Sequence, residues 1–136
     1  MNCIAPRVFI GNTLEANDRS ALQRDMIEAI LCLDGCMDPG QAEQLGVKEV
    51  VKIPLDDGPD NDPADFLKAV QELKRLADQY NRVLVHCRAG QSRSATVAAR
   101  YLMAMEDYLP EQAVRKIKYL HPPTRLTEGM FELLKS

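Results

Sequence analysis

The sequence predicts an α/β fold in which a central, largely parallel β-sheet is flanked by helices. Short apolar runs, typical of buried strands, alternate along the chain with segments whose apolar residues recur every three or four positions, as on one face of a helix. Such alternation favours parallel strands joined by helical crossovers. The 136 residues, 46% of them hydrophobic and 27% charged, are enough for one core, and no repeat or linker divides them. We therefore expect one domain covering residues 1–136.

The first half of the chain is expected to contain three strands and two helices. Their ends are marked by residues that favour helix caps and turns, such as Asn, Asp, Pro and Gly. In chain order, the elements are a strand at residues 7–10, a helix capped by Asn17 or Asp18 with Leu22, Met26 and Ile30 along one face, a strand at 30–33, a short helix opened by Asp38 and Pro39 and ended by Gly46, and a strand at 49–53.

The second half is expected to contain one strand and four helices. Two of these helices begin with proline, which suits the first helical position because the amide it lacks would have no helical partner there. The elements are a helix from Pro63, after the cap residue Asp62, with Phe66, Val70, Leu73, Ala77 and Tyr80 facing the core, a strand at 83–85, a helix at 94–105 with Val97, Tyr101 and Met105 on one face, a helix at 110–119 with Val114, Ile117 and Leu120 apolar, and a last helix carrying Met130, Leu133 and Leu134.

One loop carries the residues with distinctive chemistry. Residues 86–94, His-Cys-Arg-Ala-Gly-Gln-Ser-Arg-Ser, join the strand at 83–85 to the helix at 94–105. Amides at a helix N-terminus can surround an anion, and the helix dipole favours negative charge there. Cys87 lies in this field, which favours the nucleophilic thiolate. Arg93 offers a planar fork for two phosphate oxygens. We call residues 87–93 the signature loop and expect it to bind a tetrahedral anion beside a reactive cysteine.

The pattern His-Cys-x5-Arg-Ser in this loop resembles the signature of the cysteine-dependent protein tyrosine phosphatases. The form His-Cys-x-Ala-Gly-x-Ser-Arg-Ser is most similar to their dual-specificity branch, and residues 4–12 are similar to that family's opening strand. The resemblance implies a protein tyrosine phosphatase-like fold of the dual-specificity type. It also implies a hydrolase that removes phosphate from phosphotyrosine and from phosphoserine or phosphothreonine in proteins, through a phosphocysteine on Cys87 and without a metal or other cofactor.

The same resemblance implies which residues would act on the phosphate. Arg93 would grip it, and Ser94 would help the cysteine sulfur to leave the phosphoenzyme. The loop that holds phosphate or another oxyanion would consist of Arg88, Ala89, Gly90, Gln91, Ser92 and Arg93. Gly90 is expected where a side chain would obstruct the conformation or a close approach.

A second loop, the acidic loop at residues 56–62, is expected to supply the proton for the leaving group. In the family that the chain resembles, this acid is an aspartate upstream of the cysteine, in loops of the form Pro-x-Asp-Asp-Gly, which residues 54–58 match. Asp57, 30 residues before Cys87, is the expected general acid, and Asp56 is the alternative. The loop lacks the alternating ligands and terminal glutamate of an EF-hand, so no calcium site is expected.

Several nearby residues have two interpretations each. Ser94 could cap the following helix as well as hydrogen-bond the cysteine sulfur. His86 could order the loop and tune Cys87, or be a packed histidine at a strand end. Cys32 or Cys36 could be a resolving thiol for an oxidised Cys87, as in some members of the superfamily. A packing role is the favoured interpretation for both, because free cysteines are usually buried.

Composition excludes several classes of function. The net charge of −3 argues against a broad nucleic-acid-binding face, and no apolar run approaches membrane-spanning length, so neither nucleic acid nor membrane is expected as a partner. The four cysteines show neither a disulfide framework nor a paired Cys-x2-Cys spacing, so no metal site is expected. The N-terminus lacks a signal-peptide core, and the expected location is the cytoplasm.

Three other functions remain open from the sequence. The first is a phosphatase of non-protein substrates, such as RNA 5′ ends or phosphoinositides. The second is a non-catalytic module that binds phosphate groups. The third is sulfur transfer or arsenate reduction, which also uses an anion-binding cysteine loop. The position of Cys87 disfavours this third function, because the low-molecular-weight phosphatases and arsenate reductases carry the cysteine near the N-terminus.

Overall fold

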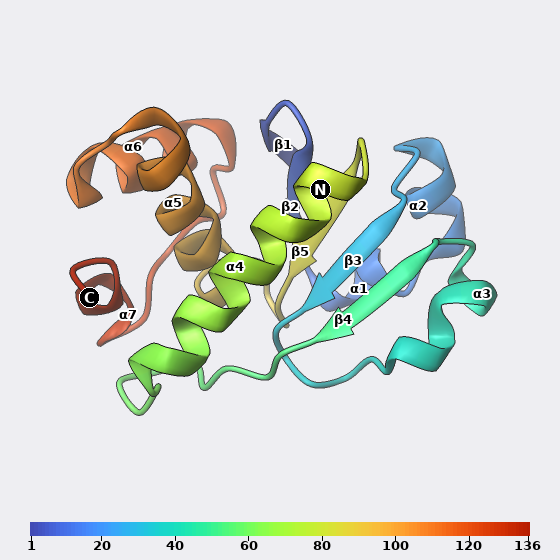
Figure 1. The fold of residues 1–136 in the computed structure, drawn as a ribbon, viewed down its shortest axis with the longest axis horizontal. Coiled ribbons are helices and arrows are strands. Elements are labelled where there is room, and N and C mark those ends of the chain that lie inside the picture. Colours follow the sequence, from blue (N-terminus) through green and yellow to red (C-terminus); the bar gives the residue numbers. More distant parts are fainter.

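The computed structural model describes all residues 1–136 and is built around one five-stranded sheet (Figure 1). Four strands, β2, β5, β3 and β4, run parallel, and β1 pairs antiparallel with β2 at one edge. The predicted α/β class with a largely parallel sheet is therefore confirmed. The spatial order is β1-β2-β5-β3-β4, and the strands are β1 (Asn2–Ala5), β2 (Val8–Gly11), β3 (Ala29–Cys32), β4 (Glu49–Lys52) and β5 (Val83–His86).

Helices cover both faces of this sheet (Figure 1). One face carries α4 (Pro63–Gln79), α5 (Arg93–Glu106), α6 (Pro110–Leu120) and α7 (Met130–Leu133) over a core of 28 buried residues. The other face carries α1 (Thr13–Ala16), α2 (Arg19–Arg24), the 3-10 turn η1 (Pro39–Gln41) and α3 (Ala42–Leu45) over a core of 11 buried residues. None of the helices has the length and apolar character needed to span a bilayer.

Side chains of one strand alternate between these two cores, as the pleat requires. Val85 and Cys87 belong to the larger core, whereas Leu84 belongs to the smaller one. On the neighbouring strand, Leu31 enters the larger core and Cys32 the smaller one. Cys87 and Cys32 therefore face opposite sides of the sheet.

The helix ends follow the capping residues in the sequence. Asp62 caps α4 by accepting a hydrogen bond from the Ala64 amide at 2.9 Å, and Gly46 ends α3 in the left-handed conformation, with φ of 76°. Asp18, one of the two expected candidates, caps α2 by accepting from two backbone amides. These starts and stops agree with the sequence analysis to within a residue or two.

Two predicted helix faces are partly wrong. The helix after Asp18 ends at Arg24, Met26 is 64% exposed with φ of 55°, and Ile30 lies in β3. The chain must turn into β3 by Ala29, which leaves no room for another helical turn. In α5, Val97 and Tyr101 are buried, but Met105 is 52% exposed because it belongs to the last turn, beyond the core.

Two short elements, β1 and α1, were not expected from the sequence. Each has four residues, too few to show a period. A capping box starts α1: the Asn12 side chain accepts from the Glu15 amide at 2.8 Å, and the Asn12 amide donates to the Glu15 carboxylate at 3.0 Å. α1 matters for function because it follows β2 directly and touches the signature loop.

The carboxyl ends of the parallel strands meet at one edge of the sheet. Gly11, His86 and Cys32 pair in register across β2, β5 and β3. The segments that leave these strands, including the signature loop after His86, therefore emerge together. Ligands of open α/β sheets bind beyond this edge, and it is where the expected site lies.

Candidate active site

Contacts to α1 and to the end of α6 fix the shape of the signature loop. Gly90 has φ of 68°, and a Cβ on it would lie 2.9 Å from the carbonyl carbon and oxygen of Gly11. Only glycine fits this conformation and this close approach, as expected. The Arg88 carbonyl accepts from the Thr13 amide at 3.1 Å, and the Gly90 carbonyl accepts from Nε2 of His121 at 2.6 Å. The amides of residues 88–92, by contrast, donate to no other group of the protein, so they are free to bind an anion.

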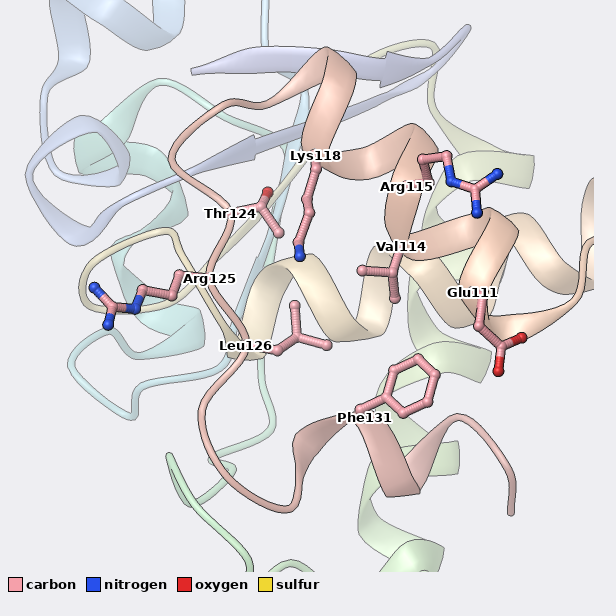
Figure 2. Close-up of a pocket in the computed structure, with 8 residues that line it drawn as sticks. All are labelled: Glu111, Val114, Arg115, Lys118, Thr124, Arg125, Leu126 and Phe131. Carbon is pink, nitrogen blue, oxygen red and sulfur yellow. The ribbon is translucent and has the colours of Figure 1, made fainter.

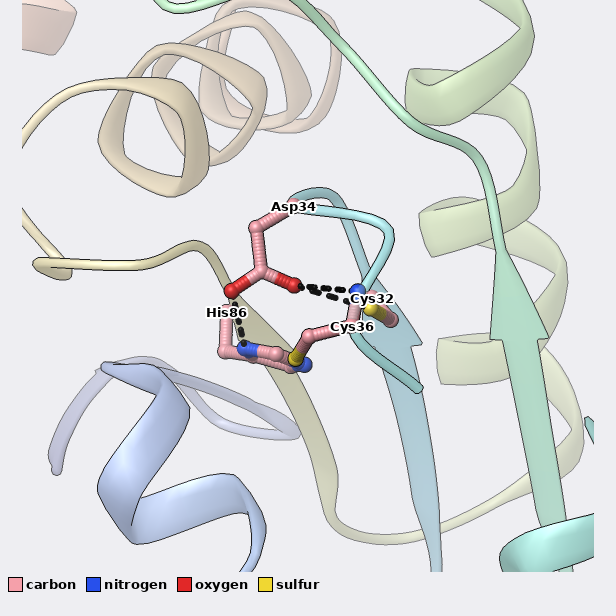
Figure 3. Close-up of side chains that lie close together, drawn as sticks. All are labelled: Cys32, Asp34, Cys36 and His86. Atoms are coloured by element: carbon pink, nitrogen blue, oxygen red, sulfur yellow. Dashed lines mark hydrogen bonds and ion pairs between the residues drawn. The ribbon is translucent and has the colours of Figure 1, made fainter. Parts of the chain in front are cut away.

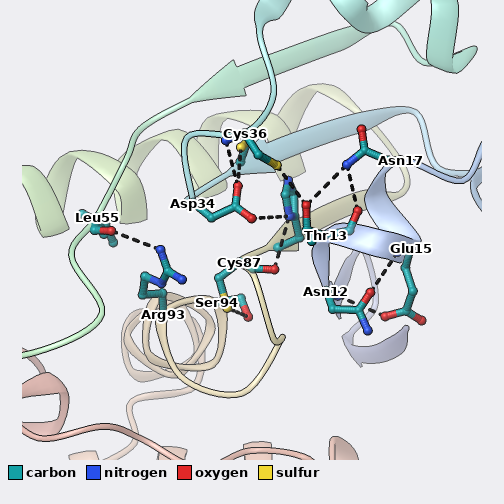
Figure 4. A network of polar contacts seen from close by, with 12 residues as sticks. Asn12, Thr13, Glu15, Asn17, Asp34, Cys36, Leu55, Cys87, Arg93 and Ser94 are labelled. Atoms are coloured by element: carbon teal, nitrogen blue, oxygen red, sulfur yellow. Dashed lines mark hydrogen bonds and ion pairs between the residues drawn. The ribbon is translucent and has the colours of Figure 1, made fainter.

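Cys87 lies at the entry to this loop, between β5 and the N-terminus of α5. Its side chain is 2% exposed, and its Sγ lies 3.1 Å from Oγ of Ser94 (Figure 4). Of the two interpretations of Ser94, the structure supports the contact with the sulfur. The Ser94 hydroxyl and the N-terminus of the 14-residue helix α5 both lie where they can stabilise negative charge on the sulfur.

Arg93, the first residue of α5, turns its guanidinium toward the β4–α4 segment. Nη1 donates to the Leu55 carbonyl at 3.3 Å, whereas the buried Nε has no hydrogen-bond partner (Figure 4). The guanidinium borders a cavity of about 250 Å³, whose walls are formed by Thr13, Asp34, Cys36, Arg88 and Arg93. The unpaired buried donor of Arg93, together with the second cationic side chain of Arg88, suits an anionic ligand.

The acidic loop is linked to the signature loop through Thr127. The Thr127 hydroxyl donates to the Asp57 carboxylate at 2.9 Å and lies 3.0 Å from the Ser92 hydroxyl. The Thr127 amide donates to the same Ser92 oxygen at 2.9 Å. Asp56 takes no part in this chain of hydrogen bonds, and only its backbone is held, by Asn61. The geometry therefore favours Asp57 over Asp56 as the side chain oriented toward the signature loop.

Two further contacts hold the acidic loop itself. The Asn61 side-chain amide donates to the carbonyls of Asp56 and Gly58, and its oxygen accepts from the Asp56 amide. Gly129, with φ of 85°, approaches so closely that a Cβ there would lie 2.5 Å from Cα of Pro59. The segment before α7 thus packs directly on the loop that carries Asp57.

His86 is fully buried behind the signature loop. Its Nδ1 donates to the Cys87 carbonyl at 3.4 Å and lies 4.0 Å from the Asp34 carboxylate. Burial lowers the pKa of His86, although Asp34 acts in the opposite direction. The histidine is thus packed at a strand end and is also bonded to the backbone of Cys87, which agrees with the packing interpretation and with a role in ordering the loop.

The other cysteines have surroundings that differ from those of Cys87. Burial, and then the hydrogen bond to Asp34, raise the pKa of Cys32 to about 12, so its thiol stays protonated at neutral pH. Cys32 also faces the opposite side of the sheet from Cys87, which agrees with its favoured packing role. Cys36 is exposed, so the favoured packing role is wrong for this residue. Its sulfur lies 2.9 Å from the Thr13 hydroxyl.

The structure thus places Cys87 and Arg93 at the two ends of the signature loop, brings Ser94 to the Cys87 sulfur, and links Asp57 to Ser92 of this loop through Thr127. Arg88, Ala89 and Gln91 are exposed on the loop, with Gly90 and Ser92 buried beneath. Thr127, His121 and Asp34 were missed by the sequence analysis. Their contacts depend on the tertiary fold, and no local pattern distinguishes them from ordinary polar residues.

A larger cavity, of about 520 Å³, opens between α6, α7 and the segment that joins them (Figure 2). Leu126 and Phe131 form its apolar side, and Lys118 and Arg125 add positive charge. The Arg125 amide donates to the Gln91 carbonyl at 2.8 Å, so this cavity is connected to the signature loop.

A cysteine and an arginine at the two ends of a loop between a central parallel strand and a helix are the arrangement found in the cysteine-dependent phosphatases. A sequence model described as the catalytic domain of dual specificity phosphatases matches residues 8–135. The chain belongs to this family, in the protein tyrosine phosphatase superfamily, and the resemblance in the signature loop is confirmed.

Relatives and solved structures agree with this assignment. The chain is 32% identical to Dual specificity protein phosphatase 22 of Mus musculus over 87% of its own length and 62% of the relative's. It is 27% identical to the human Phosphatidylglycerophosphatase and protein-tyrosine phosphatase 1 over 97% of its length and 70% of the relative's. The crystal structure of human DUSP28 superposes with a TM-score of 0.84 over 99% of this chain and 93% of that one, at 24% identity. The chain thus spans about two thirds of these two curated relatives.

Proposed function

We propose that residues 1–136 form a catalytic unit that hydrolyses phosphate monoesters of proteins, on tyrosine and on serine or threonine. The observation that carries this proposal is the position of the Cys87 sulfur, buried at the N-terminus of α5, 3.1 Å from the Ser94 hydroxyl, in a loop whose amides have no other partner. The unpaired Nε of Arg93 adds a further hydrogen-bond donor for the phosphate. Such a site stabilises a phosphoryl group by positioning and charge rather than by a cofactor.

Two steps follow from this arrangement. In the first, the Cys87 thiolate attacks phosphorus opposite the leaving oxygen, the P–O bond breaks, and Asp57 gives its proton to that oxygen. In the second, the Asp57 carboxylate takes a proton from water while the water oxygen attacks phosphorus. The P–S bond then breaks, inorganic phosphate forms, and Cys87 leaves as a thiolate that the Ser94 hydroxyl stabilises.

Thr127 keeps the acid in place in this mechanism. Its hydroxyl links Asp57 to Ser92 of the signature loop, and so sets the distance between the proton donor and the phosphate. Asp57 is itself exposed, so this connection orders a side chain that solvent would otherwise surround.

Phosphoproteins are the substrates we favour, because the family model describes dual specificity phosphatases and several relatives are named as protein phosphatases. The cavity beside Gln91 offers a place for residues that flank the phosphorylated side chain. Its three basic residues, Arg115, Lys118 and Arg125, would prefer acidic flanking residues. The four free cysteines, one of which must stay reduced for catalysis, suit the reducing environment of the cytoplasm.

Hydrolysis of para-nitrophenyl phosphate in the presence of EDTA tests the proposal. We expect turnover by the reduced protein that is indifferent to EDTA and absent from Cys87→Ser. No turnover by fresh, reduced wild type would leave phosphate binding without catalysis as the function. Turnover that persists in Cys87→Ser would exclude the cysteine mechanism.

A phospholipid or phosphoinositide is the second candidate substrate. One relative is named as a phosphatidylglycerophosphatase, and the cavity in Figure 2 combines cations with the apolar side chains of Leu126 and Phe131. Comparison of kcat/KM for a phosphotyrosine peptide and for a short-chain phosphoinositide distinguishes the two. We expect the peptide to be the better substrate.

A further inference from the structure

A second group of reactive side chains lies where β3 and β5 end and adjoins the signature loop, because Asp34 and Cys36 border the same cavity as Arg88 and Arg93. It consists of Cys32, Asp34, Cys36 and His86, and Figure 3 shows the four side chains converging on one point. One ligand atom from each residue lies within 4.8 Å of the corresponding atoms of the other three. We call this group the Cys-Asp-His cluster. The phosphatase mechanism uses none of its side chains as reacting groups.

The sheet itself creates the Cys-Asp-His cluster. Cys32 ends β3, His86 ends β5, and the two residues pair in register on adjacent parallel strands. Asp34 and Cys36 follow in the turn after β3, where Oδ1 of Asp34 accepts from the Cys32 thiol at 3.2 Å and from the Cys36 amide at 3.0 Å. These contacts hold two sulfurs, a carboxylate and an imidazole around one position.

One atom of the cluster is left without a partner. Nε2 of His86 is buried and makes no hydrogen bond, although the ring is fully enclosed. The other ring nitrogen, Nδ1, donates to the Cys87 carbonyl, which fixes the tautomer with a lone pair on Nε2. Figure 3 shows the Nε2 edge of the ring turned toward Cys36. An imidazole with one nitrogen bonded to a backbone carbonyl and the other free is the usual arrangement of a metal-binding histidine.

We infer that the Cys-Asp-His cluster is a binding site for a thiophilic divalent cation, with Zn²⁺ as the best match. Two thiolates, an imidazole and a carboxylate form a tetrahedral zinc set, and the spacing Cys32-x3-Cys36 lies within the range found in zinc sites. Zinc bonds of about 2.0–2.3 Å separate ligand atoms by roughly 3.3–3.8 Å, so the side chains need to close by about 1 Å. Cys36 is exposed and borders the cavity beside Arg93, so its side chain can make most of this movement.

Binding exchanges protons for the metal. The thiols of Cys32 and Cys36 each release a proton to solvent as their sulfurs bond to Zn²⁺, and Asp34 exchanges its hydrogen bond to Cys32 for a bond to the metal. The Thr13 hydroxyl, 2.9 Å from the Cys36 sulfur, then donates to a thiolate. No oxidant or reductant is involved.

Cobalt substitution tests the site independently of phosphatase activity. The reduced wild-type protein is titrated with Co²⁺, followed by competition with Zn²⁺, and thiolate-to-cobalt charge transfer is recorded. We expect one tightly bound Co²⁺ per chain, a spectrum typical of tetrahedral thiolate ligation, and its loss when Zn²⁺ is added. A wild-type protein that binds no metal at micromolar concentration would overturn the inference.

Three variants locate the metal. Cys36→Ser, at an exposed position that should not disturb folding, is expected to weaken binding by at least about 100-fold. Cys3→Ser, the matched exposed cysteine, and Cys87→Ser are expected to bind as wild type does. Binding that is lost in Cys87→Ser but kept in Cys36→Ser would place the metal on the signature loop and contradict the inference. Metal binding by Cys87→Ser is measured from the cobalt spectrum and not from turnover. This test therefore remains valid even if the proposed phosphatase function is wrong.

Discussion

Cys87 and Cys32 lie near the carboxyl ends of adjacent parallel strands, and both are buried, at 2% and 0% exposure. Their surroundings are nevertheless opposite in charge. Cys87 meets a hydroxyl, a helix N-terminus and the amides of the signature loop. Cys32 donates to a carboxylate, and its pKa is raised to about 12. The comparison teaches that two buried thiols on adjacent strands can differ in their chemistry, because burial and the Asp34 carboxylate both disfavour negative charge on Cys32, whereas a hydroxyl and a helix N-terminus lie beside Cys87.

The largest expected difference separates the serine variants of these two residues. Cys87→Ser should lower kcat by more than about 10⁴-fold, because the nucleophile is lost. Cys32→Ser should leave kcat close to wild type and cost about 1 kcal/mol of stability for the buried hydroxyl. Steady-state kinetics and thermal unfolding of both variants provide the measurement. Equal losses of kcat would contradict the contrast between the two sites.

Arg93→Lys should have the next largest effect. A lysine keeps the charge but loses the planar fork and the unpaired Nε, so kcat/KM should fall by about 10³-fold. The matched control is Arg88→Lys, because Arg88 also borders the cavity but is exposed on the loop. If the two variants lose the same activity, the fork geometry of Arg93 is not essential.

Asp57→Asn should slow turnover by about 10² to 10³-fold, since the leaving oxygen loses its proton donor. Asp56→Asn is the control next to it and should remain close to wild type, because its side chain has no contact with the signature loop. The decrease in turnover caused by Asp57→Asn should be smaller for substrates with very acidic leaving groups. A larger loss in Asp56→Asn would transfer the role of acid to that residue.

The smallest effect is expected for Thr127→Val, which keeps the side-chain volume but removes the hydroxyl between Asp57 and Ser92. We expect kcat to fall by about tenfold, corresponding to roughly 1.4 kcal/mol, with little change in KM. The same substitution in an Asp57→Asn background should have no further effect on kcat, as a double-mutant cycle would show. A full additional loss there would mean that Thr127 acts in another way.

Local sequence was sufficient for most of the fold and for part of the site. The capping residues Asp18, Asp62 and Gly46 and the strand before Cys87 could be recognised because each acts within a few residues of its own position. The spacing of Leu22, Met26 and Ile30 predicted a helix that is too long, because in the folded protein Ile30 belongs to β3. The periodicity of apolar residues within one segment does not show where the next strand of the sheet begins.

Contacts between distant parts of the chain could not be predicted in this way. Thr127 reaches Asp57 over 70 residues, and His121 reaches Gly90 over 31, and neither residue belongs to a motif. The Cys-Asp-His cluster has the same origin. Cys32 and Cys36 are separated by three residues, so a search for the paired Cys-x2-Cys spacing does not find them, and His86 joins them only through the pairing of β3 with β5.

The most direct test of the account is to trap the covalent intermediate. Asp57→Asn is mixed with a phosphorylated substrate that has an acidic leaving group, quenched, and digested for mass spectrometry. Without its base, hydrolysis of the intermediate slows, and we expect one phosphoryl group on the peptide that contains Cys87. A phosphoryl group on any other residue, or turnover with none detectable on Cys87, would contradict the claim that this thiolate is the nucleophile.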